Sequence, residues 1–252
     1  MTAILNQIWR HPIKSHGREE IMHVKLTEGQ MMPWDRRWAV AHEMAKFDDE
    51  NPGWAPCANF SNGAKAPALQ AITARCDLPY QTVTFSHPQL RDLTINPERE
   101  GDSGEFIQWI MPIVPKDRAL PQRLVRAPGR GMSDTDYPSI SLINLSSHRA
   151  VQQKLGREIS HLRWRGNLIL DGLGPWEEFE WIGRRLRVGL AELEVVERIE
   201  RCKATTASTQ TGERDADTLG ALQDGWGHHD MGVYAKVVKT GDIRQGDTVE
   251  LI

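Results

Sequence analysis

Apolar and polar residues alternate along much of this 252-residue chain, and glycine or proline interrupts the alternation at short intervals. Alternation with a period of two is typical of strands that bury one face, and many short strands separated by turn residues indicate a β-sandwich or barrel. In the first half of the chain the pattern predicts strands at residues 4–9, 21–26, 35–41, 69–75, 81–85, 91–95 and 123–127.

The alternation is clearest around Gly189, where residues 185–188 and 191–196 predict a β-hairpin. A buried strand is expected at 139–145, because that segment is almost continuously apolar. The remaining strands predicted in the second half are 168–170, 231–238 and 243–252.

Two segments predict helices. Residues 106–111 are too continuously apolar for a surface strand, and Asp102-Ser103 just before them is a possible helix cap. A second helix is expected after 146–147, where either serine can cap it, with Gly156 at its end. The stretch from Gly212 to Gly227 is polar and is expected to be irregular. The chain is thus expected to be mainly β with a few helices, an α+β fold.

Two irregular segments divide the chain. Residues 48–67 are rich in Asn, Gly, Pro and Ala and predict a long loop, which in a small domain is often functional. Residues 128–136 form the best candidate for a linker. We therefore expect a smaller, strand-rich N-terminal domain at 1–127 and a C-terminal β-barrel domain at 137–252.

Composition restricts the functional classes. A formal net charge of −3 argues against a dedicated nucleic-acid binder. Three cysteines without paired spacing form neither a disulfide framework nor a zinc pattern, so a reducing compartment is expected. The first ten residues lack the pattern of a secretory signal, and no window approaches 18 apolar residues. A cytoplasmic protein that does not associate with membranes is expected.

The segment Arg201–Gly212 carries the most distinctive chemistry. It places Cys202 between the cations Arg201 and Lys203, and cationic neighbours favour the nucleophilic, metal-binding thiolate. An ordinary surface turn with an inert cysteine remains an alternative at this point. No histidine accompanies Cys202 in a local motif, so a Cys–His hydrolase is not indicated.

Two further turns suit an anion. Residues 13–18 combine Lys14, Ser15 and Arg18 with a glycine, and residues 163–167 place Arg163 and Arg165 beside Gly166. Backbone N–H groups and cations in such turns can hold a phosphate, although a solvated turn explains the same residues. His228-His229-Asp230 lacks a third spaced ligand and is not expected to bind a metal ion.

Taken in order, several stretches resemble the molybdenum-cofactor sulfurase C-terminal (MOSC) family, preceded by its usual N-terminal β-barrel domain. The resemblance covers nearly the whole chain and is greatest to the amidoxime-reducing members. The matching segments are 9–15, 35–38, 165–172, 181–186, 201–206, 232–235 and 241–247.

The resemblance implies a shared binding site for molybdenum cofactor. In the family's pattern, Cys202 corresponds to a cysteine that ligates molybdenum in reductases and is proposed to carry a persulfide in sulfur-transfer members. Gly166 replaces the usual proline, which loosens that turn, and Ala207-Ser208 replaces an Asp-Pro pair on the substrate side. The residues that the resemblance assigns to cofactor binding are Lys14, Ser15, Arg36, Arg165, Asn167, Arg201, Thr205 and Tyr234.

The implied function is that of a molybdenum-dependent oxidoreductase that reduces small N-hydroxylated compounds, such as amidoximes, or related N- and S-oxides. No four-cysteine cluster motif is present, so a separate electron donor of the ferredoxin or cytochrome b5 type is implied. Three alternatives stay open: a sulfur carrier with a Cys202 persulfide, a non-enzymatic phosphate-ligand or nucleic-acid module, and pyridoxal phosphate as the ligand. Because the anion-binding turns are distant in sequence, we expect the two halves to meet at a cleft.

Overall fold

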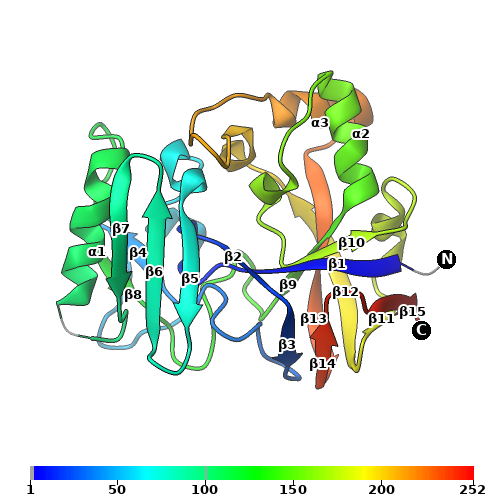
Figure 1. The fold of residues 1–252 in the computed structure, drawn as a ribbon, viewed down its shortest axis with the longest axis horizontal. Coiled ribbons are helices and arrows are strands. Elements are labelled where there is room, and N and C mark those ends of the chain that lie inside the picture. Colours follow the sequence, from blue (N-terminus) through cyan, green and yellow to red (C-terminus); the bar gives the residue numbers. More distant parts are fainter. Residues whose placement is uncertain (1–2, 100) are drawn as a thin grey trace.

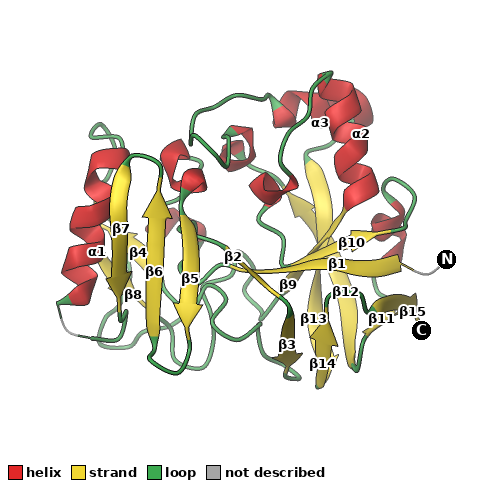
Figure 2. Cartoon of the chain, viewed as in Figure 1, coloured by secondary structure: helices red, strands yellow, loops and turns green. Residues whose placement is uncertain are grey.

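Strands dominate this computed structural model, which describes residues 3–99 and 101–252 and contains three α-helices within them (Figure 2). Two bodies lie side by side, one holding a closed barrel and the other smaller sheets with one helix (Figure 1). The predicted fold class, a mainly β barrel domain packed with a smaller strand-rich domain, is confirmed.

The barrel contains seven strands in the order β10-β9-β13-β12-β11-β15-β1, and pairing of β1 with β10 closes it. Neighbouring strands are antiparallel except β9 and β10, which are parallel. A short strand, β2, pairs with the outer end of β1. The bounds are β1 Ala3–Arg10, β2 Glu19–Ile21, β9 Ile140–Asn144, β10 Leu168–Asp171, β11 Arg185–Val188, β12 Ala191–Glu200, β13 Asp230–Lys239 and β15 Thr248–Leu251.

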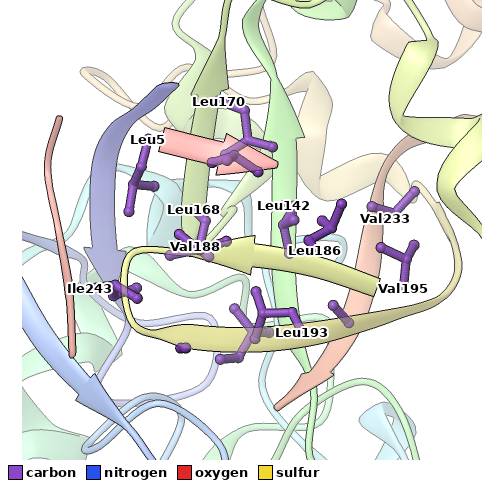
Figure 3. Packing of buried hydrophobic residues seen from close by; sticks show 14 of the residues in the cluster. Leu5, Leu142, Leu168, Leu170, Leu186, Val188, Leu193, Val195, Val233 and Ile243 are labelled. Atoms are coloured by element: carbon purple, nitrogen blue, oxygen red, sulfur yellow. The ribbon is translucent and has the colours of Figure 1, made fainter. Parts of the chain in front are cut away.

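Alternating side chains fill the barrel. Leu186 and Val188 of β11 are fully buried while the residues between and before them are exposed, as the hairpin pattern predicted. Figure 3 shows Leu142, Leu193 and Val233 pointing into the same interior from three other strands. Each fully buried leucine or valine contributes on the order of 1.5–3 kcal/mol relative to its exposed state.

The first strand belongs to the barrel and not to the body formed by the rest of the N-terminal half. Ile4 is opposite Asp171 of β10, and Ala3 is opposite Val249 of β15 (Figure 1). Strand β3 (His23–Leu26) likewise pairs with β14 (Gly241–Arg244). The domain boundary expected at 128–136 stays a prediction, and two of the strands that precede residue 27, β1 and β3, pair with the C-terminal half of the chain.

The second body packs two small sheets against helix α1 (Asp102–Ile110). Phe85 and Phe106 are fully buried in its core, with ring centroids 4.8 Å apart. Trp38 lies in the same core, 2% exposed. The sheets consist of β4 (Ala39–His42) with β8 (Pro121–Val125), and of β5 (Thr73–Asp77), β6 (Thr82–His87) and β7 (Leu90–Ile95).

Two helices cover one end of the barrel, α2 (Leu145–Leu155) and α3 (Thr218–Trp226). The expectation that the stretch up to Gly227 is irregular was wrong over α3. Its glycines and polar residues obscured the apolar period, but Asp217 caps the helix by accepting a hydrogen bond from the N–H of Gly220 at 2.9 Å. Among the described residues no helix has both the length and the apolar character needed to cross a membrane.

Other predicted elements needed smaller corrections. Residues 69–75 divide into a 3-10 turn and β5, and residues 21–26 belong to two strands, β2 and β3. The cap of α2 is Asn144, two or three residues before the serines that were expected, because its side chain accepts from the N–H of Ser146. The 3-10 helices are η1 Cys57–Asn59, η2 Pro67–Ala71, η3 Met111–Ile113, η4 His161–Trp164, η5 Glu177–Trp181 and η6 Lys203–Thr206.

Gly166, where the family pattern has proline, lies directly against the barrel. A Cβ at this position would lie 2.2 Å from Cγ1 of Ile143, a buried atom close to the backbone. We expect Gly166→Ala to lower the free energy of unfolding by about 1–3 kcal/mol through overpacking, measured by urea denaturation. The control is Gly104→Ala in α1, where a Cβ meets nothing within 4 Å and helix propensity predicts unchanged or raised stability. Equal stability of the two variants would contradict this account.

Buried histidines predict the acid sensitivity of the fold. His16 is fully buried at the junction of the two bodies, where Nδ1 donates to the carbonyl of Lys14 at 2.7 Å and the ring meets Phe106 edge-to-face. Burial lowers the pKa of His16 from 6.5 to about 4. Between these values the unfolded chain binds a proton that the folded protein excludes, so stability falls as the pH falls.

We expect the unfolding free energy of the wild type to decrease steadily from pH 6.5 to pH 4. His16→Asn keeps a donor near the position of Nδ1 but cannot titrate, so its slope should be shallower by up to about 1.4 kcal/mol per pH unit. Urea denaturation at several pH values measures the slope. Replacement of the exposed His23 by Asn is the control, and a slope that is unchanged in both variants would rule out His16 as a source of acid sensitivity.

Candidate functional site

A cavity of about 590 Å³ opens where the two bodies meet, within the usual size range of small-molecule sites. Its walls come from the turn after β1, loop 57–65, segment 134–136, the end of β12 with the turn that follows, and β13. The predicted site residues that line it are Lys14, Ser15, Arg36, Arg165, Arg201, Cys202, Thr205 and Tyr234.

Lys14 lies in the turn that leaves β1, and its backbone N–H donates to the carbonyl of Trp38 at 2.8 Å. The side chain is 3% exposed, and Nζ donates to the carbonyl of Met132 at 3.0 Å and forms an ion pair with Asp134. Ser15 follows with a φ of 64°, a left-handed conformation that turns the chain sharply at the cavity wall.

Arg36 is also held in a left-handed conformation, with a φ of 47°. Its guanidinium is paired with the carboxylate of Asp35, and Nη2 donates to the carbonyl of Arg165 at 2.9 Å. Burial opposes the charge of Arg36, but the attraction of Asp35 and Asp134 outweighs it and raises the pKa. Arg36 therefore joins the second body to the turn of the barrel that contains Arg165.

Arg165 ends η4 with a φ of 51°. Nη2 donates to the carbonyl of Gly17 at 3.1 Å, while Nη1 is buried without a hydrogen-bond partner in the described protein. Burial, together with repulsion from Arg36 and Arg18, lowers the pKa of Arg165 to about 9. An unpaired buried N–H donor costs on the order of 1–3 kcal/mol, which an acceptor on a ligand would recover.

Asn167 is the one predicted site residue that does not line the cavity. It is 1% exposed, and its side-chain oxygen accepts from the hydroxyl of Ser141 at 2.8 Å and from Nη1 of Arg36 at 3.3 Å. Its side-chain amide donates to the carbonyl of Trp9. Asn167 therefore positions the guanidinium of Arg36 from outside the cavity and links β1 to β9.

Arg201 turns its guanidinium inward, onto backbone carbonyls. Nε donates to the carbonyl of Met231 at 2.8 Å, and Nη1 donates to that of Trp164 at 2.7 Å. Burial lowers the pKa of Arg201 to about 10. Among the described residues, neither Arg201 nor Arg165 forms an ion pair with a carboxylate, so both add uncompensated positive charge to the cavity.

Cys202 is exposed at the cavity, at the start of the short turn η6. Thr205 fixes that turn, because its buried hydroxyl donates to the carbonyl of Cys202 at 3.0 Å and is 2.7 Å from the hydroxyl of Thr218. Tyr234 lines the cavity from β13, and burial raises the pKa of its phenol.

Long side chains brace the turn from both bodies. Arg163 donates to the carbonyl of Thr205 at 3.0 Å, and Gln70 donates to that of Ala204 at 3.0 Å. Arg214 donates to the carbonyls of Lys203 and Ala64, at 2.5 and 2.8 Å, which links the turn to the facing loop. The thiol of Cys202 is thus carried on a backbone with little freedom to move.

Sequence reasoning missed several lining residues, of which Asp134 and Cys57 matter most. Asp134 lies in the segment taken for a linker. Cys57 lies in the loop that was flagged as functional, and burial raises the pKa of its thiol to about 11. Only proximity in space reveals them, because none belongs to a motif that can be identified from spacing.

The residues present fit an anionic ligand that carries a soft metal. Seven cationic residues line the cavity, among them Lys14, Arg36, Arg165 and Arg201, and of these four only the first two are paired with a carboxylate in the described structure. A phosphate group matches this excess of positive charge and the unpaired Nη1 of Arg165. An exposed thiol on the same cavity is a suitable ligand for a soft metal.

Comparison with known proteins agrees with this chemistry. Over 98% of its length the chain is 25% identical to the mitochondrial amidoxime-reducing component 1 of Mus musculus, of which it covers 81%. It is 29% identical to a molybdenum cofactor sulfurase of Drosophila ananassae over 59% of the chain, and it spans 20% of that relative's length. The YuaD protein of Bacillus subtilis shares the fold, with a TM-score of 0.50 at 13% identity, over 100% of this chain and 96% of that one.

Family models match most of the chain. The MOSC N-terminal beta barrel domain matches residues 2–109, and the MOSC domain matches residues 132–250. All the residues that line the cavity, including the cysteine turn, lie within these two matches. The chain therefore belongs to the MOSC family and carries the N-terminal beta barrel domain associated with it.

Proposed function

We propose that the protein binds molybdenum cofactor and reduces N-hydroxylated compounds, such as amidoximes, or related N- and S-oxides, with Cys202 as the protein ligand to the metal. The observation that carries the proposal is the convergence of five buried or half-buried cations and one exposed thiol on a single cavity. Similarity to an amidoxime-reducing component over 98% of the chain supports the reductase type.

Each residue has a role that follows from its contacts. Lys14, Ser15 and Arg165 would hold the terminal phosphate, since a lysine, a hydroxyl and an unpaired guanidinium N–H are suitable phosphate donors. Arg36 would contact the cofactor while Asn167 keeps its guanidinium in place. Arg201 and Tyr234 would line the remainder of the cavity.

The bound cofactor would supply the two-electron redox chemistry at oxygen, and the protein would supply ligation, orientation and the shape of the pocket. Thr205 and Arg163 position the backbone of the Cys202 turn, so the sulfur is presented from a fixed support. Electrons would come from a separate donor protein of the ferredoxin or cytochrome b5 type, because the three cysteines cannot hold an iron–sulfur cluster of the usual four-cysteine kind.

The proposal is tested with protein purified from a host that makes molybdenum cofactor. We expect bound molybdenum, pterin fluorescence after oxidation, and reduction of an amidoxime with a chemical electron donor. Cys202→Ser should reduce the rate at least about 100-fold, since a serine hydroxyl is a poor ligand for a soft metal, while pterin is retained. Cys76→Ser, which changes a half-buried thiol outside the cavity, should keep full activity. Absence of both molybdenum and pterin from the wild type would refute the proposal.

Replacement of Arg165 separates ligand binding from stability. In Arg165→Gln we expect pterin content to fall about tenfold or more, because a phosphate contact is lost. The free energy of unfolding should change little or rise, since a buried cation without a carboxylate partner is costly. The matched control is Arg37→Gln. Arg37 is a more exposed neighbour of Arg36 and is paired with Glu98, so this variant should retain pterin. Normal pterin content in Arg165→Gln would show that Arg165 does not hold the cofactor.

A sulfur carrier is the second candidate function. It is favoured by the exposure of Cys202 and by the sulfurase names of several relatives. Mass spectrometry of protein incubated with a persulfide donor, whose outer sulfur passes to the Cys202 thiolate as the donor thiol leaves, would then detect a persulfide on Cys202. A separate assay would show no amidoxime reduction. Activity with a molybdenum-loaded preparation and no persulfide would exclude this alternative.

A further inference from the structure

Among the described residues, Asp134 is the carboxylate that forms an ion pair with Lys14, and the Asp134 side chain is far more exposed than that of Lys14. The Asp134 side chain is 54% exposed, whereas the Lys14 side chain is 3% exposed. Lys14 has one other acceptor among the described residues, the carbonyl of Met132. If the ion pair separates, Asp134 is the partner that can leave, because its carboxylate is the exposed member of the pair, whereas Lys14 stays hydrogen-bonded to the carbonyl of Met132.

The backbone around Asp134 is fixed. Ser133 and Thr135 on either side are 2% and 8% exposed. The hydroxyl of Thr135 donates to the carbonyl of Tyr137 at 2.6 Å, and Arg130 donates to the carbonyl of Thr135 at 3.0 Å. Movement of Asp134 therefore needs only rotation of one side chain into the cavity mouth, with no change of the segment that carries it.

Asp134 also supplies negative charge to the rest of the cavity. Its carboxylate is close enough to Arg36, Arg165 and Arg201 for their charges to interact. Although desolvation alone would raise the pKa of Asp134, the attraction of Lys14, Arg36 and Arg201 lowers it, so the group is a carboxylate at neutral pH. Asp134 therefore occupies the position at which these cations would attract an anionic group of a ligand most strongly.

We propose that Asp134 is an internal competitor for the anion site, which pairs with Lys14 when no phosphate is bound and is displaced by a phosphate group. This inference rests on the proposed function only in assigning a phosphate-bearing ligand to the cavity. The consequence is selectivity. A monoanion merely replaces one carboxylate at Lys14, whereas a phosphate dianion also satisfies the unpaired Nη1 of Arg165.

The test measures binding of inorganic phosphate and of acetate to purified protein without cofactor, by isothermal titration calorimetry at pH 7.5. In Asp134→Asn the amide keeps the size of the side chain but removes the competing charge. We expect this variant to bind phosphate about tenfold more tightly than the wild type and to discriminate less against acetate. The matched control is Asp136→Asn, an exposed carboxylate on the same cavity that has no ion pair in the described structure, which should bind phosphate as the wild type does.

Thermal unfolding shows whether each variant is folded, and added phosphate should raise the melting temperature of Asp134→Asn more than that of the wild type. Equal or weaker phosphate binding by Asp134→Asn would overturn the proposal and make Asp134 a support for Lys14. An equal gain in phosphate affinity in Asp136→Asn would also overturn the proposal, since removal of any negative charge from the cavity would then explain the effect. Because no molybdenum or catalysis is measured, the result is independent of the reductase proposal.

Discussion

Pairing of the first strand with the strands of the C-terminal half is the constraint on which the rest of the structure depends. β1 fills the gap between β10 and β15, and only with it is the sheet a closed barrel without free edges there. The same strand leads directly into the turn that carries Lys14 and Ser15. The backbone hydrogen bonds of β1 therefore both close the barrel and place the turn that carries Lys14 and Ser15.

The cavity is costly to the fold. Arginine side chains in a partly dehydrated space lose hydrogen bonds to water. Arg165 and Arg201 replace some of them with hydrogen bonds to backbone carbonyls. Burial lowers the pKa of both groups, because the charged form is the one that loses hydration. A protein under selection for stability alone would replace such residues with apolar ones of similar volume. Their presence on a single cavity indicates a ligand that carries negative charge.

The thiol and the cations are held in different ways. Cys202 is exposed on a turn whose backbone is braced by Arg163, Gln70 and Arg214, so its position is defined while its sulfur remains accessible. Lys14 is itself buried and depends on an accessible partner, Asp134. A rigid reactive group beside a replaceable counter-ion suits a site that must bind a large charged molecule and then act at one end of it.

Much of the fold was predictable from the chain alone, because strand alternation around Gly189 and the apolar segment that became β9 reflect local burial patterns. The motif resemblance also indicated the cations and the cysteine. What local pattern could not reveal was α3, whose apolar period is obscured by glycines and whose stability comes from packing on α2 and the barrel. It also could not show that residues before 27 pair with the last third of the chain, since strand partners are chosen by long-range burial.

The same division applies to the site. Residue types and short spacing indicated two turns suited to an anion and a cysteine between two cations, because each turn's chemistry is local. Only the tertiary structure brought them to one cavity, placed Asn167 beneath Arg36 instead of on the wall, and set Asp134 against Lys14 across 120 residues of chain. Charge pairing at a distance depends on where the backbone folds, and a linear sequence does not specify it.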